Sequence, residues 1–91
     1  MAQSAEKVES SIEEFIRNRF NVQPDDSLFA RDINLWEYGY ADSVGVVELI
    51  SFLETTFGVR LPDGAFFDPD FTSIQGISRI VQRHIQESPG S

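Results

Sequence analysis

The chain has 91 residues, of which 41% are hydrophobic, and its formal net charge is −8 at pH 7. This length and apolar content suit one folded domain and argue against global disorder, while the negative charge disfavours nucleic-acid and anionic-membrane binding. The sequence contains no cysteine, which excludes disulfides, thiolate zinc sites and a cysteine nucleophile.

No apolar run approaches the about 20 residues that a membrane span needs, and residues 1–10 lack the apolar block of a signal peptide. We therefore expect a cytoplasmic protein without membrane insertion. Residues 1–91 should form a single domain, with an ordered core at about residues 6–87, and the protein should be a monomer.

The first predicted element is an amphipathic helix over residues 6–19. Its apolar residues recur at steps of three and four positions, as on one face of a helix: Val8, Ile12, Phe15 and Ile16. Asn21 and Pro24 should end it. Residues 21–41 follow as a long connection rich in aromatic and aliphatic side chains. Such a connection is expected to pack over the core.

A second helix is predicted over residues 43–57. Asp42 or Ser43 can cap its start, and Gly58 should end it. One face carries the apolar residues expected to point into the core: Val46, Leu49, Ile50, Leu53 and Phe57.

After this helix, the sequence predicts one helical turn at residues 63–67 and a last helix from Thr72. Thr72 and Gln75 have the spacing of a capping box, and Gly76 should weaken the helix by about 1 kcal/mol relative to alanine. The apolar face of this helix comprises Ile74, Ile77, Val81 and Ile85.

No segment shows strand alternation. We therefore predict an all-α four-helix bundle, with three main helices, one short helix and a long loop between helices 1 and 2. The residues expected in its core include Phe15, Ile50, Leu53, Phe57 and Ile77.

No residues combine into a catalytic or metal site. His84 is the only histidine and is expected at or near the surface of the last helix. Asp68, Asp70 and Thr72 alternate as at the start of a calcium loop, but the glycine and glutamate that such a loop requires later are missing.

Ser43 is the most informative residue, because it lies where the long loop meets a helix N-terminus. Such a serine is exposed, and the N–H groups and positive dipole end of the helix would tolerate a phosphodiester. The simpler interpretation is an ordinary helix cap formed by Asp42 and Ser43.

A wider segment resembles the acyl carrier protein superfamily. The resemblance rests on the pattern Leu35-Trp36-x-x-Gly39-x-x-Asp42-Ser43-Val44, followed by Glu48-Leu49 and Phe57-Gly58-Val59. It implies that a phosphopantetheinyl transferase attaches 4'-phosphopantetheine from coenzyme A to Ser43, with Asp42 as part of the motif. It also implies a carrier with no catalytic residues of its own, which holds its cargo as a thioester.

The departures from fatty-acid carriers suggest a specialised pathway. Gly39 lies three positions before the Asp-Ser pair, and Gly45 replaces an acidic residue. In these respects the chain is more similar to D-alanyl carrier proteins and related free-standing carriers. The implied partners are an acyl- or aminoacyl-loading ligase and a downstream acyltransferase or synthase. A housekeeping fatty-acid carrier is the alternative.

The partner-binding face is expected beside Ser43 on the second helix. Its residues offer apolar contact with acidic flanks, which would attract basic partner surfaces: Val44, Val47, Glu48, Ser51 and, at its edge, Glu54. Alternatively, Val44 and Val47 are core residues, and the acidity serves only solubility.

The cargo is expected to be a small polar or aminoacyl unit that stays outside the core. Bulky rings should leave no continuous void for a long acyl chain: Phe15, Phe29, Trp36 and Phe57. Two other classes remain open, an unmodified protein-interaction module and a small regulatory helical protein with a fortuitous motif.

Overall fold

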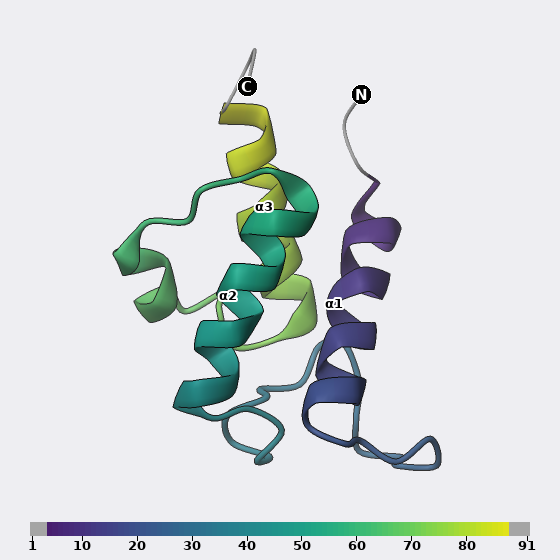
Figure 1. Cartoon of the computed structure of the whole chain (residues 1–91). Helices are drawn as coiled ribbons and strands as arrows, with labels where there is room; N and C mark the ends of the chain where they lie inside the picture. The colour runs from purple at the N-terminus through teal and green to yellow at the C-terminus, as the bar shows by residue number, and fades with distance from the viewer. Residues whose placement is uncertain (1–3, 88–91) are drawn as a thin grey trace.

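The computed structural model describes residues 4–87 and contains no strand within them. Its elements in chain order are α1 (Ala5–Arg19), α2 (Ser43–Phe57), the 3-10 helix η1 (Asp63–Phe67) and α3 (Ile74–Glu87) (Figure 1). The all-helical prediction is confirmed for this part of the chain, and α2 has the predicted bounds. No helix of the described part is long and apolar enough to cross a membrane.

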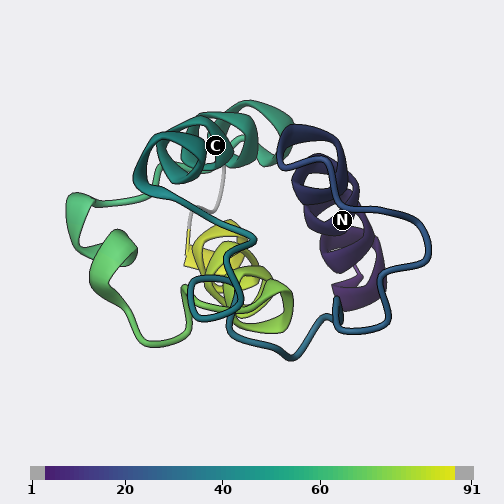
Figure 2. The ribbon, with the colours of Figure 1, turned by 90° about the horizontal axis from the view of Figure 1, so that it is seen from below.

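The three α-helices surround one hydrophobic core, and the long loop crosses the end of the bundle where α2 begins (Figure 2). α1 runs antiparallel to α2, so the last turn of α1 lies beside the first turn of α2 (Figure 1). The segment after α2 forms η1, a five-residue 3-10 helix rather than an α-helix. The helices therefore bring the start of α2 to an exposed end of the molecule.

Helix α1 buries the predicted stripe of Val8, Ile12 and Ile16. The side chain of Ser4 caps its start by accepting a hydrogen bond from the N–H of Lys7 at 3.2 Å. Phe15 lies at the edge of the stripe and is only partly buried. The spacing of the apolar residues thus predicted which face of α1 is buried, but not how far around the helix the buried face extends.

Helix α3 begins two residues later than predicted. Ser73 caps it, because its Oγ accepts a hydrogen bond from the N–H of Gly76 at 3.0 Å. Thr72 instead donates its hydroxyl hydrogen to the carbonyl of Pro69 at 2.8 Å. The capping box predicted from Thr72 and Gln75 is therefore wrong.

The structural role of Gly76 also differs from the prediction. A Cβ atom at this position would overlap the backbone of Asp70. The glycine allows the chain before α3 to pass directly against the helix. Glycine lowers the helix propensity at this position, but a larger residue would not fit beside Asp70.

The loop at residues 20–42 is anchored to the rest of the protein, as its apolar content predicted. Leu35 is buried, and its N–H donates to the carbonyl of Thr72 at 2.7 Å. The indole N–H of Trp36 donates to the carbonyl of Phe71 at 3.2 Å. The N–H of Gln75, in the first turn of α3, donates to the carbonyl of Arg31 at 3.0 Å.

Arg31 also ties the loop to α1 through its side chain. Its guanidinium contacts Glu6 at 2.7 Å, Glu9 at 3.5 Å and Glu13 at 2.7 Å. Hydrogen bonds with Glu6 and Glu13 raise the pKa of Arg31, and the hydrogen bond from Arg31 is the main cause that lowers the pKa of Glu13. One loop residue thus compensates three carboxylates on one helix.

The composition of the core corrects the sequence-based prediction. Leu53 and Ile77 are buried, but Phe15, Ile50 and Phe57 are only partly buried at its margin. Apart from Phe29 and Phe71, the buried side chains are aliphatic or small, as the following set shows: Val8, Ile12, Ile16, Leu35, Val46, Leu49, Leu53, Val59, Leu61, Ala65, Ile74, Ile77, Ser78, Ile80 and Val81. The core is therefore not filled with aromatic rings.

Candidate functional site

Ser43 is the first residue of α2 and is exposed. Asp42, not Ser43, is the N-cap: its Oδ1 accepts a hydrogen bond from the N–H of Gly45 at 2.7 Å. Within residues 4–87, the Ser43 hydroxyl has no hydrogen-bond partner. Because Asp42 performs the capping, the Ser43 hydroxyl is left available for a reaction.

The start of α2 would suit a phosphodiester at this hydroxyl. The first turn contains no acidic residue, and the first N–H groups of a helix combine with its dipole to stabilise an anion. The residues present therefore fit a phosphopantetheine group on Ser43, whose phosphodiester would lie at the positive end of the helix.

The segment before Ser43 is held by a pair of side chains within the loop. The hydroxyl of Tyr40 donates a hydrogen bond to Oδ2 of Asp26 at 2.6 Å. This bond is the main cause that lowers the pKa of Asp26 and raises that of Tyr40. The Tyr40 ring also packs edge-on against Phe29, with 5.1 Å between ring centroids. These contacts fix the backbone shortly before Asp42 and Ser43.

Beside Ser43, α2 presents an exposed apolar pair. Val44 is 65% exposed and Val47 is 63% exposed, so the alternative that both are core residues is wrong. Ser51, one turn further, is also exposed. Apolar side chains of this size on a helix of a small protein form a surface that a partner can cover.

The two acidic residues expected in the partner face have different surroundings. Glu48 is exposed and forms an ion pair with Arg19, the last residue of α1. This hydrogen bond is the main cause that raises the pKa of Arg19. Glu54 is partly buried, and its Oε2 accepts the N–H of Leu61 at 2.9 Å. Glu54 therefore holds the segment that follows α2.

Sequence reasoning did not find the contact that seats the start of α2 against α1. Phe20 covers Gly45, where a Cβ atom would overlap its ring. A glycine in the first turn of a helix with an apolar face was the available signal, since glycine lowers helix propensity and usually has a packing reason there.

The other candidates from the sequence have structural roles. His84 is partly buried, and its Nδ1 lies 3.0 Å from the carbonyl oxygen of Ile80. Asp68 accepts the N–H of Asp70 at 2.9 Å, and Asp70 pairs with Arg79. Within residues 4–87, no group of three or more acidic, histidine or cysteine side chains could hold a metal ion.

An exposed serine at the start of α2, in the helical fold of residues 4–87, is compatible with a carrier protein. A family model described as "Phosphopantetheine attachment site" matches residues 10–81. The chain therefore belongs to the phosphopantetheine-attachment family, within the acyl carrier protein superfamily. Members of this family are non-catalytic, hold 4'-phosphopantetheine covalently and are modified by a phosphopantetheinyl transferase.

Comparison with individual proteins points toward one branch of this family. The chain is 36% identical over 78 residues to the D-alanyl carrier protein of Streptococcus pyogenes serotype M5 (strain Manfredo), covering 79% of this chain and 89% of that protein. The D-alanyl carrier proteins of serotype M49 (strain NZ131) and serotype M1 match with the same identity and coverage. The chain is therefore a carrier protein that is similar to D-alanyl carrier proteins.

Proposed function

We propose that Ser43 carries the phosphopantetheine arm, and that the protein delivers a small acyl or aminoacyl thioester to the enzymes of a specialised biosynthetic pathway. The observation that carries this proposal is the Ser43 hydroxyl, which is exposed and without a hydrogen-bond partner among the described residues, while Asp42 caps the helix. Asp42 thereby acts as a positioning residue.

Attachment requires little from the carrier itself. The Ser43 oxygen attacks the phosphorus atom that bears the pantetheine in coenzyme A. The new serine–phosphorus ester bond forms as the bond to the second phosphate breaks, and adenosine 3',5'-bisphosphate leaves. The hydroxyl proton passes to a base of the transferase. The start of α2 supplies N–H groups that stabilise the resulting phosphodiester.

The arm then supplies the thiol that the chain lacks. Because the sequence has no cysteine, no side-chain thiol competes for the activated acyl group. Tethering the thioester raises the effective concentration of the cargo at each partner enzyme.

An amine-bearing cargo is favoured by the similarity to D-alanyl carrier proteins. The core adds no support for a small cargo, since its buried side chains are mainly aliphatic and not the bulky rings expected from the sequence. The proposed size and charge of the cargo are therefore supported only by the similarity to D-alanyl carrier proteins.

The partner face is proposed at Val44, Val47, Glu48 and Ser51, on the exposed side of α2. Its partners would be the transferase, a loading ligase and a downstream acyltransferase or synthase. We further propose that the chain acts as a single domain, a monomer in the cytoplasm, with η1 as the fourth element of the bundle.

The test is intact-mass analysis after incubation with coenzyme A and a broad-specificity phosphopantetheinyl transferase. The wild-type protein should gain the mass of one phosphopantetheinyl group, and Ser43→Ala should gain none. Ser10→Ala is the matched control, because Ser10 is an exposed serine on α1, and it should load normally. Full loading of Ser43→Ala, in a protein with an unchanged helical circular dichroism spectrum, would refute the assignment.

A further inference from the structure

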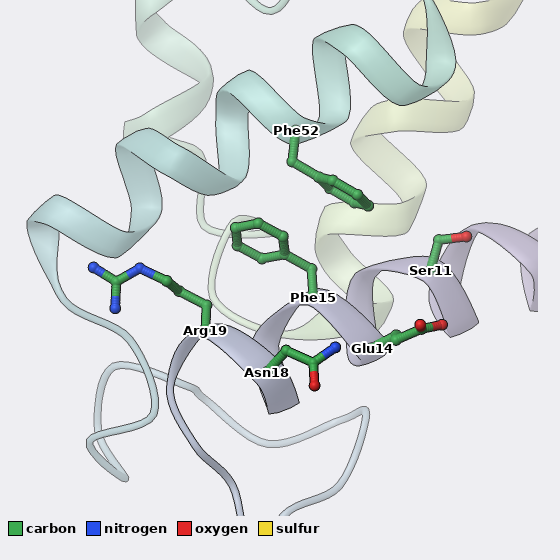
Figure 3. Close-up of a pocket in the computed structure, with 6 residues that line it drawn as sticks. All are labelled: Ser11, Glu14, Phe15, Asn18, Arg19 and Phe52. Carbon is green, nitrogen blue, oxygen red and sulfur yellow. The ribbon is translucent and has the colours of Figure 1, made fainter.

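An open pocket of about 450 Å³ lies in the groove between α1 and α2 (Figure 3). Phe15 from α1 and Phe52 from α2 stack within it, with ring centroids 4.7 Å apart and an angle of 28° between the ring planes. Both rings are partly buried against the core. The remaining lining residues are polar and all come from α1: Ser11, Glu14, Asn18 and Arg19.

The charges around the pocket leave one carboxylate uncompensated. Arg19 is paired with Glu48, so its positive charge is already neutralised. Glu14 is exposed and has no hydrogen bond or ion pair among the described residues. The pocket therefore combines an aromatic surface with a free negative charge. Ammonium groups bind to both features, through ion pairing and through the faces of aromatic rings.

The pocket lies within reach of Ser43. Phe52 follows Ser43 by nine positions, which is about 14 Å along a helix rising 1.5 Å per residue. An extended phosphopantetheine chain is longer than this span. Arg19, which lines the pocket, points toward the start of α2 (Figure 3) and pairs there with Glu48.

The arm would have to curve around α2 to reach the pocket. Nine residues turn a helix by two and a half turns, which places Phe52 and Ser43 on opposite sides of α2. At about 100° per residue, Val44 and Glu48 lie at angular positions of α2 between those of Ser43 and Phe52, so the arm would pass the exposed Val44 and the ion pair of Glu48 with Arg19. The excess length of the arm over the axial distance allows this curve.

We propose that this pocket binds the amine-bearing acyl end of the thioester on the chain's own arm. The ammonium group contacts Glu14, and the apolar part of the acyl unit lies against Phe15 and Phe52. The inference rests on the proposed function, since it requires the arm on Ser43 and an aminoacyl cargo. It adds a cargo site on the outer surface of the α1–α2 groove, which is compatible with the expectation that the cargo stays outside the core.

The experiment compares arms that differ only in charge at the cargo. The transferase loads arms that carry alanyl or isobutyryl through a stable amide in place of the thioester, from the corresponding coenzyme A analogues. A methyl group replaces the ammonium group in isobutyryl, so the two cargoes have nearly the same shape. Nuclear Overhauser contacts and ring-proton shifts of Phe15 and Phe52 are measured relative to the unacylated arm.

We expect contacts between the alanyl methyl group and both rings, and loss of these contacts in Glu14→Gln and with the isobutyryl arm. Glu37→Gln is the matched control, because Glu37 is an exposed carboxylate in the loop, and it should retain the contacts. Ring signals that are unchanged by the alanyl arm would overturn the proposal. Equal contacts for both arms, unaffected by Glu14→Gln, would overturn recognition of the amine.

Loading is followed by intact mass in the same samples, which distinguishes a failure to load Ser43 from a failure of the cargo to bind the pocket. Failure to load Ser43 would refute the proposed function and this inference together. Complete loading without cargo contacts would leave the carrier function supported and refute only the pocket.

Discussion

Phe20, directly after α1, lies over Gly45 in the first turn of α2, so closely that a Cβ atom at position 45 would overlap its ring. The neighbouring ion pair of Arg19 with Glu48 joins the same two helix ends. The end of α1 thus fixes the position of the helix turn that presents Ser43.

Gly45→Ala should lower the free energy of unfolding in the wild-type protein, because the new methyl group displaces the Phe20 ring. In a Phe20→Ala background the same change should stabilise the protein, by up to about 1 kcal/mol, since alanine is then the better helix former. Urea unfolding of the four proteins measures this coupling. Equal effects of Gly45→Ala in both backgrounds would show that the two residues do not interact.

Gly76→Ala should be more harmful than Gly45→Ala. Its methyl group meets the backbone of Asp70 rather than the end of a side chain, and backbone cannot rotate away. Overpacking of this kind typically costs about 1–3 kcal/mol. Thermal unfolding checks it, with Gly64→Ala as the control, since a Cβ atom there has open space. A raised melting temperature for Gly76→Ala would contradict the packing described above.

Leu53→Ala should cost about 2–5 kcal/mol, because it removes a fully buried side chain from the core. Val47→Ala, on the same helix but 63% exposed, should change the free energy of unfolding by less than about 0.5 kcal/mol. Both are measured by denaturant unfolding. Similar losses for the two variants would mean that the buried face of α2 is misassigned.

Val47→Arg should slow loading or downstream transfer while leaving thermal stability nearly unchanged, because it places a charge on the proposed partner face. High salt should slow association of the wild-type protein, since it screens the long-range attraction of acidic groups. Glu48→Lys alone also breaks the pair with Arg19, so the informative variant combines Glu48→Arg with Arg19→Glu. Unaltered transfer kinetics in Val47→Arg would rule out this face.

Stability should decrease in acid as Glu13 becomes protonated. Its pKa is lowered from an ordinary value of 4.5, mainly by the hydrogen bond from Arg31. A lowered pKa in the folded state stabilises the protein above the unfolded value, and this contribution is lost as pH falls through the folded value. Unfolding measured from pH 7 down to about pH 3 should therefore show a decline below about pH 4.5, weaker in Arg31→Gln. Arg83→Gln, which removes an exposed arginine of α3, should keep the full decline.

The local sequence predicted the features of α2 well. The apolar spacing identified Val46, Leu49 and Leu53 as buried, Asp42 was one of two expected caps, and Gly58 adopts the left-handed conformation that ends the helix, with φ of 66°. These features depend on neighbouring residues, so a single sequence carries them. The exposure of Ser43 follows from the same local pattern.

Features set by distant contacts were not predictable in this way. Thr72 and Ser73 are both suitable caps, and the choice depends on the hydrogen bonds of Pro69 and Arg31 with this segment. Periodicity likewise could not distinguish the buried Leu53 from the half-buried Phe57, because the helix packing decides where the core ends. The pairing of Arg19 with Glu48 spans 29 positions, beyond any local signal.

The bonds between the loop and the start of α3 also bear on how the protein is made. The indole of Trp36 bonds to a carbonyl 35 positions further along the chain, and Leu35 and Arg31 bond to the same late segment. During synthesis, Ser43 is added to the chain before the residues that hold its preceding loop. Because closing such distant contacts must await the later chain, the proposed attachment site reaches its folded form only once α3 has been made and has docked.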